Sequence, residues 1–184
     1  TTANSLNTTY ATGAVSFQND TGSNKTTAYI GGLIGINGGS GAATAASITS
    51  SYASGSVSST HSSTGATQYV GGLVGLNNST SSSSIVSSYT NGAGTVSYTG
   101  GIASVVGGLV AYNQAGTIDQ SYSTKTVSTS YTGSTAITSI MGGLIGQSDG
   151  ALTSSYASSG SVTLSNTASG NVNTSYIGCL IGYM

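Results

Sequence analysis

Hydrophobic residues return along this chain in one short phrase, and long polar stretches separate its copies. The phrase joins two apolar residues, two small residues, a leucine, a β-branched residue and another small residue, as in Tyr29–Gly35. Copies begin near residues 29, 69, 105, 140 and 176, so the step between them is 35 to 40 residues. A fixed period in this range is the signature of a repeat architecture. The repeated leucines are Leu33, Leu73, Leu109, Leu144 and Leu180, and the repeated glycines are Gly31, Gly32, Gly71, Gly72, Gly107, Gly108, Gly142, Gly143 and Gly178.

A second phrase places an aliphatic residue four positions before a tyrosine, as in Ile48–Tyr52. A valine follows each tyrosine five to seven residues later, after a stretch rich in Gly, Ser and Thr. Because side chains alternate along a strand, the even spacing predicts that the aliphatic residue and the tyrosine face the same side. We therefore expect the tyrosines to form an inward ladder whose hydroxyls reach a partner or solvent. They are Tyr10, Tyr52, Tyr89, Tyr122 and Tyr156.

The two phrases predict about three short strands in each repeat, joined by polar turns, and no segment has a helical period. The sequence thus indicates an all-β protein, a parallel β-helix or β-solenoid of about five repeats of roughly 36 residues, forming a single domain over residues 1–184. Whether a repeat makes one wide coil or two narrow ones stays open. Stacked coils would align the leucines inward. The paired glycines would stand where the wall is crowded or where the backbone needs positive φ. We expect Asn37, Asn77 and Asn113 in polar turns, because asparagine tolerates left-handed backbone and caps a turn with its own side chain.

Charge is scarce. The 184 residues include only 2 Lys+Arg and 3 Asp+Glu, the net charge is −1, and 36% of residues are hydrophobic. This balance disfavours disorder, which goes with low hydrophobicity and high net charge. A chain without a basic stripe has no means of binding nucleic acid through phosphates, and no apolar run approaches the roughly 20 residues of a membrane span. A nearly neutral surface tends to associate, so we expect either glycans or self-association.

Glycosylation is a candidate because the chain carries several Asn-x-Ser/Thr sequences, which accept N-linked glycans on secreted proteins. The candidate residues are Asn7, Asn19, Asn24, Asn77, Asn78 and Asn173.

The sequence offers little for catalysis. Apart from tyrosines, the ionisable residues are Asp20, Asp119, Asp149, His61, Lys25, Lys125 and Cys179. The two carboxylates Asp119 and Asp149 occupy different repeat positions, which disfavours paired acid–base chemistry. His61 lies in a Ser/Thr-rich stretch typical of an exposed turn, although a Ser-His-Asp set around it stays open. No His/Cys cluster suits a metal. We predict no enzyme, no metal and no cofactor.

The two phrases resemble the GLUG repeat, on Gly-Gly-Leu-Ile/Val-Gly-x-Asn and on Ser-Tyr-Ala-x-Gly-x-Val. Residues 10–15 and 52–57 match the second pattern closely, whereas residues 122–127 lack its glycine. The resemblance covers almost the whole chain. It implies an extracellular or cell-surface β-solenoid module, of the kind found in secreted filamentous-haemagglutinin-type adhesins and beside surface peptidases. It implies no ligand, because scaffold residues define the repeat.

These observations favour an extracellular structural or adhesive protein. The chain starts just after the place of one Gly-Gly-Leu phrase and finishes on another. We therefore expect it to stack head to tail on itself into a filament, or to belong to a longer array of flanking repeats. The candidate end-to-end contacts are Ile177, Cys179, Ile181 and Tyr183. Cys179 replaces the last paired glycine, either as a small buried residue or as a thiol linked to a neighbouring chain.

Two other functions stay open. A flat Ser/Thr face would suit ice, although Thr-x-Thr pairs do not recur at one repeat position, and exposed aromatic residues would suit host or surface glycans. The aromatic candidates are Tyr98, Tyr112, Tyr131 and Tyr183. Alternatively, the solenoid is the passive stalk of a larger secreted protein.

Overall fold

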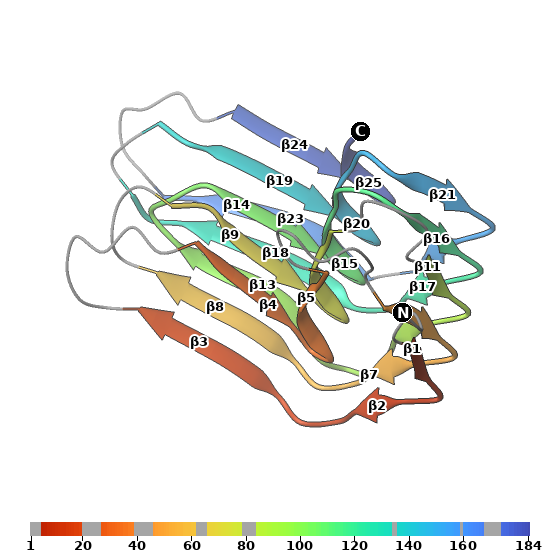
Figure 1. Ribbon diagram of the computed structural model, residues 1–184. Helices are drawn as coiled ribbons and strands as arrows, with labels where there is room; N and C mark the ends of the chain where they lie inside the picture. The colour runs from red at the N-terminus through yellow and green to blue at the C-terminus, as the bar shows by residue number, and fades with distance from the viewer. Residues whose placement is uncertain are drawn as a thin grey trace.

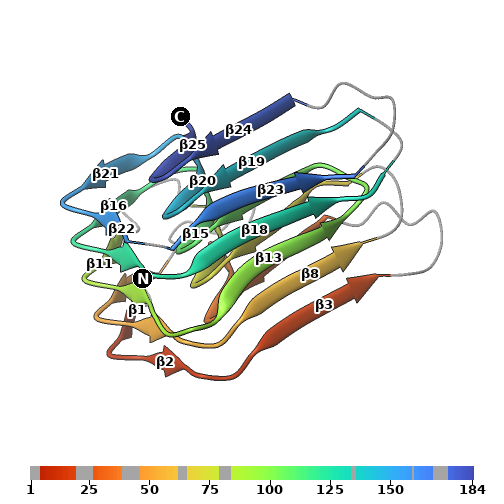
Figure 2. The same cartoon turned by 180° about the vertical axis from the view of Figure 1, so that it is seen from behind.

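The computed structural model describes residues 5–19, 27–38, 46–61, 66–78, 84–133, 136–158, 160–167 and 174–184. In these ranges the chain forms 25 strands and no helix. The strands make five coils stacked along one axis, with the first coil at one end of the stack and the fifth at the other (Figures 1 and 2). The prediction of an all-β parallel solenoid is confirmed.

Each coil contributes one strand to each of five parallel sheets. The first sheet contains β1 (Ser5–Asn7), β6 (Ser47–Thr49), β11 (Ser84–Val86), β16 (Thr117–Asp119) and β21 (Ala151–Thr153). The second contains β2 (Tyr10–Ala11), β7 (Tyr52–Ala53), β12 (Tyr89–Thr90), β17 (Tyr122–Ser123) and β22 (Tyr156–Ala157). The third contains β3 (Val15–Asn19), β8 (Val57–His61), β13 (Thr95–Gly100), β18 (Thr126–Tyr131) and β23 (Val162–Asn166).

The remaining two sheets flank the Gly-Gly-Leu phrase. The fourth contains β4 (Ala28–Gly31), β9 (Gln68–Gly71), β14 (Ser104–Gly107), β19 (Thr138–Gly142) and β24 (Thr174–Gly178). The fifth contains β5 (Ile34–Asn37), β10 (Val74–Asn77), β15 (Val110–Asn113), β20 (Ile145–Ser148) and β25 (Ile181–Tyr183). We number the coils one to five, so that coil one runs from β1 to β5 and coil five from β21 to β25.

A repeat therefore makes one wide coil, and the expectation of three strands per repeat was wrong because each coil has five. Two corners account for the difference. The Gly-Gly-Leu phrase bends the chain between β4 and β5, and a residue in left-handed conformation separates β1 from β2. The equivalent left-handed residues are Thr8, Ser50, Ser87, Gln120 and Ser154, with φ between 46° and 54°.

A serine ladder holds this left-handed corner. The hydroxyl of Ser51 donates to Thr49 O at 2.8 Å and accepts the backbone N–H of Thr9 at 3.1 Å. Ser88 repeats the pattern one coil on, since it donates to Val86 O at 2.9 Å and accepts from Ser51 N at 3.2 Å. Both side chains are buried. Each hydroxyl thus satisfies backbone groups of its own coil and of the coil before, which offsets the cost of a left-handed non-glycine residue.

The core lies inside the coils and follows the register. Equivalent residues pair across neighbouring coils, such as Val96 with Val57 and with Val127. Leu73, Leu109 and Leu144 are fully buried and pack with the isoleucines of the first sheet. Equivalent residues of successive coils lie over one another. The same small core unit is therefore repeated five times along the stack.

Close approach explains the paired glycines. Among described residues, the glycines with positive φ are Gly38, Gly92 and Gly116, none of which belongs to a Gly-Gly-Leu phrase. A Cβ placed on Gly108 would instead lie 2.0 Å from the Gly143 carbonyl oxygen of the next coil. The wall is crowded there, and the alternative explanation by positive φ was wrong.

Candidate functional site

Five tyrosines form a stacked column along the solenoid, which we call the tyrosine column (Tyr10, Tyr52, Tyr89, Tyr122 and Tyr156). Neighbouring ring centroids lie 4.9 to 5.2 Å apart and the ring planes differ by only 1° to 8°. The expected inward ladder was wrong, because the left-handed corner changes which side the chain presents. Ile48 and Ala53 point into the core, whereas Tyr52 between them lies at the surface.

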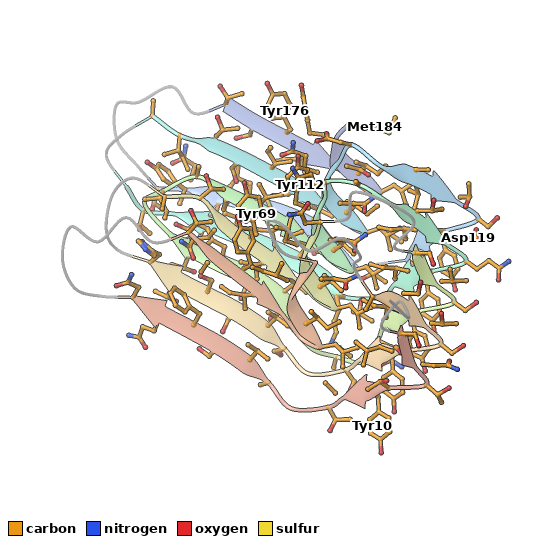
Figure 3. The ribbon with its side chains drawn as sticks, viewed as in Figure 1. Tyr10, Tyr69, Tyr112, Asp119, Tyr176 and Met184 are labelled. Atoms are coloured by element: carbon orange, nitrogen blue, oxygen red, sulfur yellow. The ribbon has the colours of Figure 1, made fainter. Side chains whose placement is uncertain are left out.

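Stacking between neighbouring rings covers the ring faces of the tyrosine column, except for the outer faces of its two end rings. Tyr10 is 63% exposed and Tyr156 is 53% exposed. Figure 3 shows Tyr10 on the first coil, and Tyr176 and Met184 at the opposite end of the stack. Inside the column, burial is the main cause that raises the pKa of Tyr122. The neighbouring Tyr89 and Tyr156 raise it further.

A buried amide ladder runs along the fifth sheet. Asn37 Nδ2 donates to Asn77 Oδ1 at 2.8 Å, Asn77 Nδ2 donates to Asn113 Oδ1 at 2.8 Å, and Asn113 Nδ2 donates to Ser148 Oγ at 3.2 Å. Asn37 also bonds both backbone groups of Ala46, at 2.8 and 3.0 Å. These asparagines end strands, are buried and have no positive φ, so the expectation of left-handed backbone was wrong, whereas the expected capping of the turn by the side chain is confirmed at Asn37. Gly38, which follows Asn37, takes the positive φ instead.

The amide ladder also removes one glycosylation candidate. Asn77 is fully buried with its Nδ2 engaged, so no glycan fits there in the folded chain. Asn7 is exposed, Asn78 is half-buried, and Asn19 Nδ2 lies 3.2 Å from His61 Nε2. Asn24 and Asn173 lie outside the described residues.

The aromatic residues proposed for glycan recognition do not form one surface. Tyr98 and Tyr131 are buried, where Tyr98 accepts the N–H of Ile102 at 3.2 Å and Tyr131 donates to Gly101 O at 3.4 Å. Burial is the main cause that raises the pKa of Tyr98 to about 12. The hydrogen bond from Ile102 lowers this pKa, and the charge of Tyr131 raises it. Tyr183 is exposed at the C-terminal end, in edge contact with Tyr176 at 5.1 Å.

A shorter aromatic stack lies on the outside of the fourth and fifth sheets. Tyr69 stacks on Tyr29 at 5.0 Å and on Tyr112 at 5.9 Å. Tyr69 and Tyr112 lie close together on this face in Figure 3. Tyr112 donates to Asp149 Oδ2 at 2.5 Å. Burial, the hydrogen bond to Asp149, and the charges of Asp149 and Tyr69 raise the pKa of Tyr112.

The ionisable side chains that the structure describes do not converge on a catalytic arrangement. Asp119 accepts from Thr153 at 2.7 Å while Asp149 accepts from Tyr112, so the two carboxylates serve different partners. His61 is fully buried at the end of β8, and its expected place in an exposed turn was wrong. Asp20 and Lys25 lie outside the described residues. Within the described part of the chain, no three His, Cys, Asp or Glu side chains form a metal-binding group.

Lys125 is a buried cation that spans three coils. Its Nζ donates to Ser54 O and, at 3.1 Å, to Gly55 O, both two coils away. The intervening coil leaves room through Gly94, where a Cβ would lie 2.6 Å from Lys125 Nζ. Burial lowers the pKa of Lys125 below the ordinary 10.5. The amine thus ties coil four to coil two through carbonyl oxygens.

Lys125 predicts a rise in stability with pH. Between the lowered pKa and 10.5, the unfolded amine binds more protons than the folded one, so the unfolding free energy rises with pH in this window. The unfolding free energy of wild type minus that of Lys125→Met should increase as the pH rises toward 10.5. Urea titrations of both proteins at each pH measure it. A difference that stays constant would contradict this role.

The C-terminal end face exposes residues whose counterparts inside the stack are buried. Leu180 is 37% exposed and Ile177 is 48% exposed, whereas Leu144 and Met141 below them are fully buried. Ile181 is half-buried. Cys179 is a free thiol and is exposed, so its expected burial was wrong. The surroundings of Cys179 differ from those of the glycines at the same position in coils one to four, because no described coil follows coil five.

Comparison of the chain with protein-family models, curated proteins and solved structures finds no match. The resemblance to the GLUG repeat accordingly stays a prediction. Nowhere in the described ranges is there a helix with the length and hydropathy needed to cross a membrane.

Proposed function

We propose that this chain is an extracellular structural protein of a cell surface, whose solenoid associates end to end with further copies of itself. The observation that carries the proposal is that every coil presents the same ladders in register, so the face of one coil matches that of another. Tyr10 in the first coil, and Tyr156, Ile177 and Leu180 in the fifth, are exposed, whereas their counterparts between described coils are buried or half-buried. Exposed apolar surface and unpaired strand edges favour association with another chain.

The two end faces are complementary because every coil repeats the same ladders. The ring of Tyr156 at one end and the ring of Tyr10 at the other would continue the tyrosine column, whose spacing is about 5 Å throughout. A contact that joins one end of a copy to the opposite end of the next does not close on itself, and it therefore produces a filament.

The sides of the solenoid fit a surface role. Charged residues make up 3% of the chain, and Ser and Thr fill many outward positions of the strands. Stability then comes from the stacking of equivalent residues, which does not require ion pairs or a cofactor. The resemblance to the GLUG repeat, typical of secreted surface proteins, supports the extracellular location.

Charges placed on either end face should abolish association. Leu180→Lys and Tyr10→Lys each put an ammonium group into the proposed contact, where its desolvation is costly. Sedimentation velocity over a concentration series should show large linear species for wild type and only single chains for both variants. Val86→Lys is the matched control, because β11 presents this half-buried residue on the side of coil three. If wild type sediments as one chain at every concentration, or if the control also loses association, the proposal fails.

A further inference from the structure

The two glycines of each Gly-Gly-Leu phrase are required by different parts of the structure. The atom nearest to a Cβ on the first glycine belongs to its own coil, Val110 O at 1.9 Å for Gly107 and Ile181 O at 1.8 Å for Gly178. For Gly107, Gly146 N of the following coil also lies at 2.7 Å, so the clash with the own coil is the shorter of the two. Real Cβ atoms essentially never come within 3.0 Å of such an atom. The first position is accordingly glycine in all five coils, coil five included.

The second glycine is required by the following coil. A Cβ at Gly32, Gly72 or Gly108 would lie 2.3, 2.0 or 2.0 Å from the carbonyl oxygen of the equivalent residue one coil on. At Gly143 it would lie 2.1 Å from the carbonyl oxygen of Cys179. The other close atoms at this position also come from the following coil, such as Ser123 Oγ at 2.4 Å from the Cβ on Gly108.

Cys179 occupies this second position in coil five and carries the side chain that the other four coils exclude. We infer that Cys179 is a steric stop, which prevents any further coil from continuing the backbone ladder in register on the C-terminal face. Its Cβ and Sγ fill the space in which the carbonyl oxygen of a following coil would lie. The partner to which this applies is a second copy of the chain, whose Gly32 carbonyl would take that place.

A second departure from the repeat lies on the same face. The amide ladder passes from Asn113 to Ser148. Met184 stands three residues after Ile181, as Ser148 stands three residues after Ile145, and it is 82% exposed. A methionine has no donor for the Asn37 Oδ1 of a following copy. Cys179 lies before the corner at Leu180 and Met184 lies after it. Both residues therefore disfavour a further coil stacked in register.

The inference that Cys179 is a steric stop rests on the proposed end-to-end association, and it specifies the geometry of that contact. Copies would meet through side chains such as Tyr156, Ile177 and Leu180, with their backbones held apart near Cys179. A junction without a full backbone ladder is weaker than the contact between two coils of one chain. Association would thus be reversible, and the residue at position 179 would set its strength.

Two variants separate the steric effect from thiol chemistry. Cys179→Gly removes the Cβ, whereas Cys179→Ala keeps it and removes only the sulfur. Under reducing conditions, Cys179→Gly should associate at a concentration roughly tenfold or more below that of wild type. Cys179→Ala should behave as wild type. If wild type associates and Cys179→Gly shows no gain, or if Cys179→Ala gains as much, the stop is overturned while the proposed function stands.

A lengthened chain tests the stop even if the proposed association fails. Repeating residues 147–184 after Gly182 appends a sixth coil in phase, because Gly182 stands where Gly146 stands one repeat earlier. With glycine at position 179, the added coil should fold onto coil five, and its amides should become protected from hydrogen exchange. With cysteine at this position, those amides should exchange freely. Equal protection in the two lengthened chains would overturn the inference.

Discussion

Replacing Gly108 with alanine should lower the free energy of unfolding by more than about 4 kcal/mol, which is among the largest effects of single substitutions. The added methyl group would lie 2.0 Å from Gly143 O and 2.4 Å from Ser123 Oγ. Gly143 O belongs to the backbone of coil four, so the two coils must separate to admit the methyl group. That separation would break the hydrogen bonds from Gly108 N to Gly142 O and from Leu109 N to Leu144 O.

Urea unfolding followed by circular dichroism measures this loss. Hydrogen exchange shows whether protection disappears between coils three and four first, as expected for a stack stabilised by contacts between neighbours. Gly13→Ala is the matched control, because a Cβ on Gly13 meets nothing within 4 Å and should change stability by at most about 0.5 kcal/mol. A Gly108→Ala protein as stable as wild type would show that the coils are not packed as described.

Replacing Asn77 with alanine should cost about 3 kcal/mol, since it leaves buried polar groups on two coils without partners. Asn113 Oδ1 loses the Asn77 amide donor, and Asn37 Nδ2 loses one of its two acceptors. The carbonyl oxygen of Ala115 loses its bond to Asn77 Nδ2 at 3.2 Å. The gap left by the missing amide adds a packing loss.

Asn78→Ala is the control for this prediction, because Asn78 follows Asn77 directly but is only half-buried. Its backbone N–H donates to Asn37 O at 2.8 Å, a bond that alanine keeps. Asn77→Ser should fall between the two variants, as serine already ends the ladder at Ser148. Thermal and urea unfolding compare the four proteins. Equal losses for Asn77→Ala and Asn78→Ala would contradict a role for the amide ladder.

The features that could be predicted from the sequence are those that repeat. The period and the absence of helical spacing were enough to predict a parallel solenoid, because stacking equivalent coils aligns equivalent residues. The orientation of the tyrosines was not predicted. The parity argument assumes one continuous strand from Ile48 to Tyr52, whereas Ser50 adopts φ of 50° between them. Neither glycine nor asparagine marks that corner, and the serine or threonine before each tyrosine was the available signal.

Residues that depend on contacts between distant segments were harder to predict. Nothing near Lys125 in the sequence indicates that it reaches Ser54 and Gly55 two coils away. The contact depends on the space at Gly94 in the turn of coil three, which is two residues longer than the corresponding turn of coil two. His61 resembled a turn residue because its neighbours are Ser and Thr, yet in register it pairs with Gly100 inside a sheet.

The environment of Cys179 could not be predicted from the sequence. The sequence shows that a cysteine replaces a repeated glycine, but it does not show whether its side chain is buried or exposed. That depends on which coil would clash with a side chain at this position. The clash of each second glycine with the following coil decides this. The same substitution would be disruptive in coils one to four, where the following coil is described.

Electron microscopy of the purified chain under reducing, native conditions tests the central claim, end-to-end association, most directly. Five coils at about 4.8 Å each predict linear particles with an axial repeat of about 24 Å per chain, slightly longer in wild type than in Cys179→Gly. Leu180→Lys should give separate short rods. Wild-type particles that stay single at all concentrations, or that associate side by side, would contradict the claim.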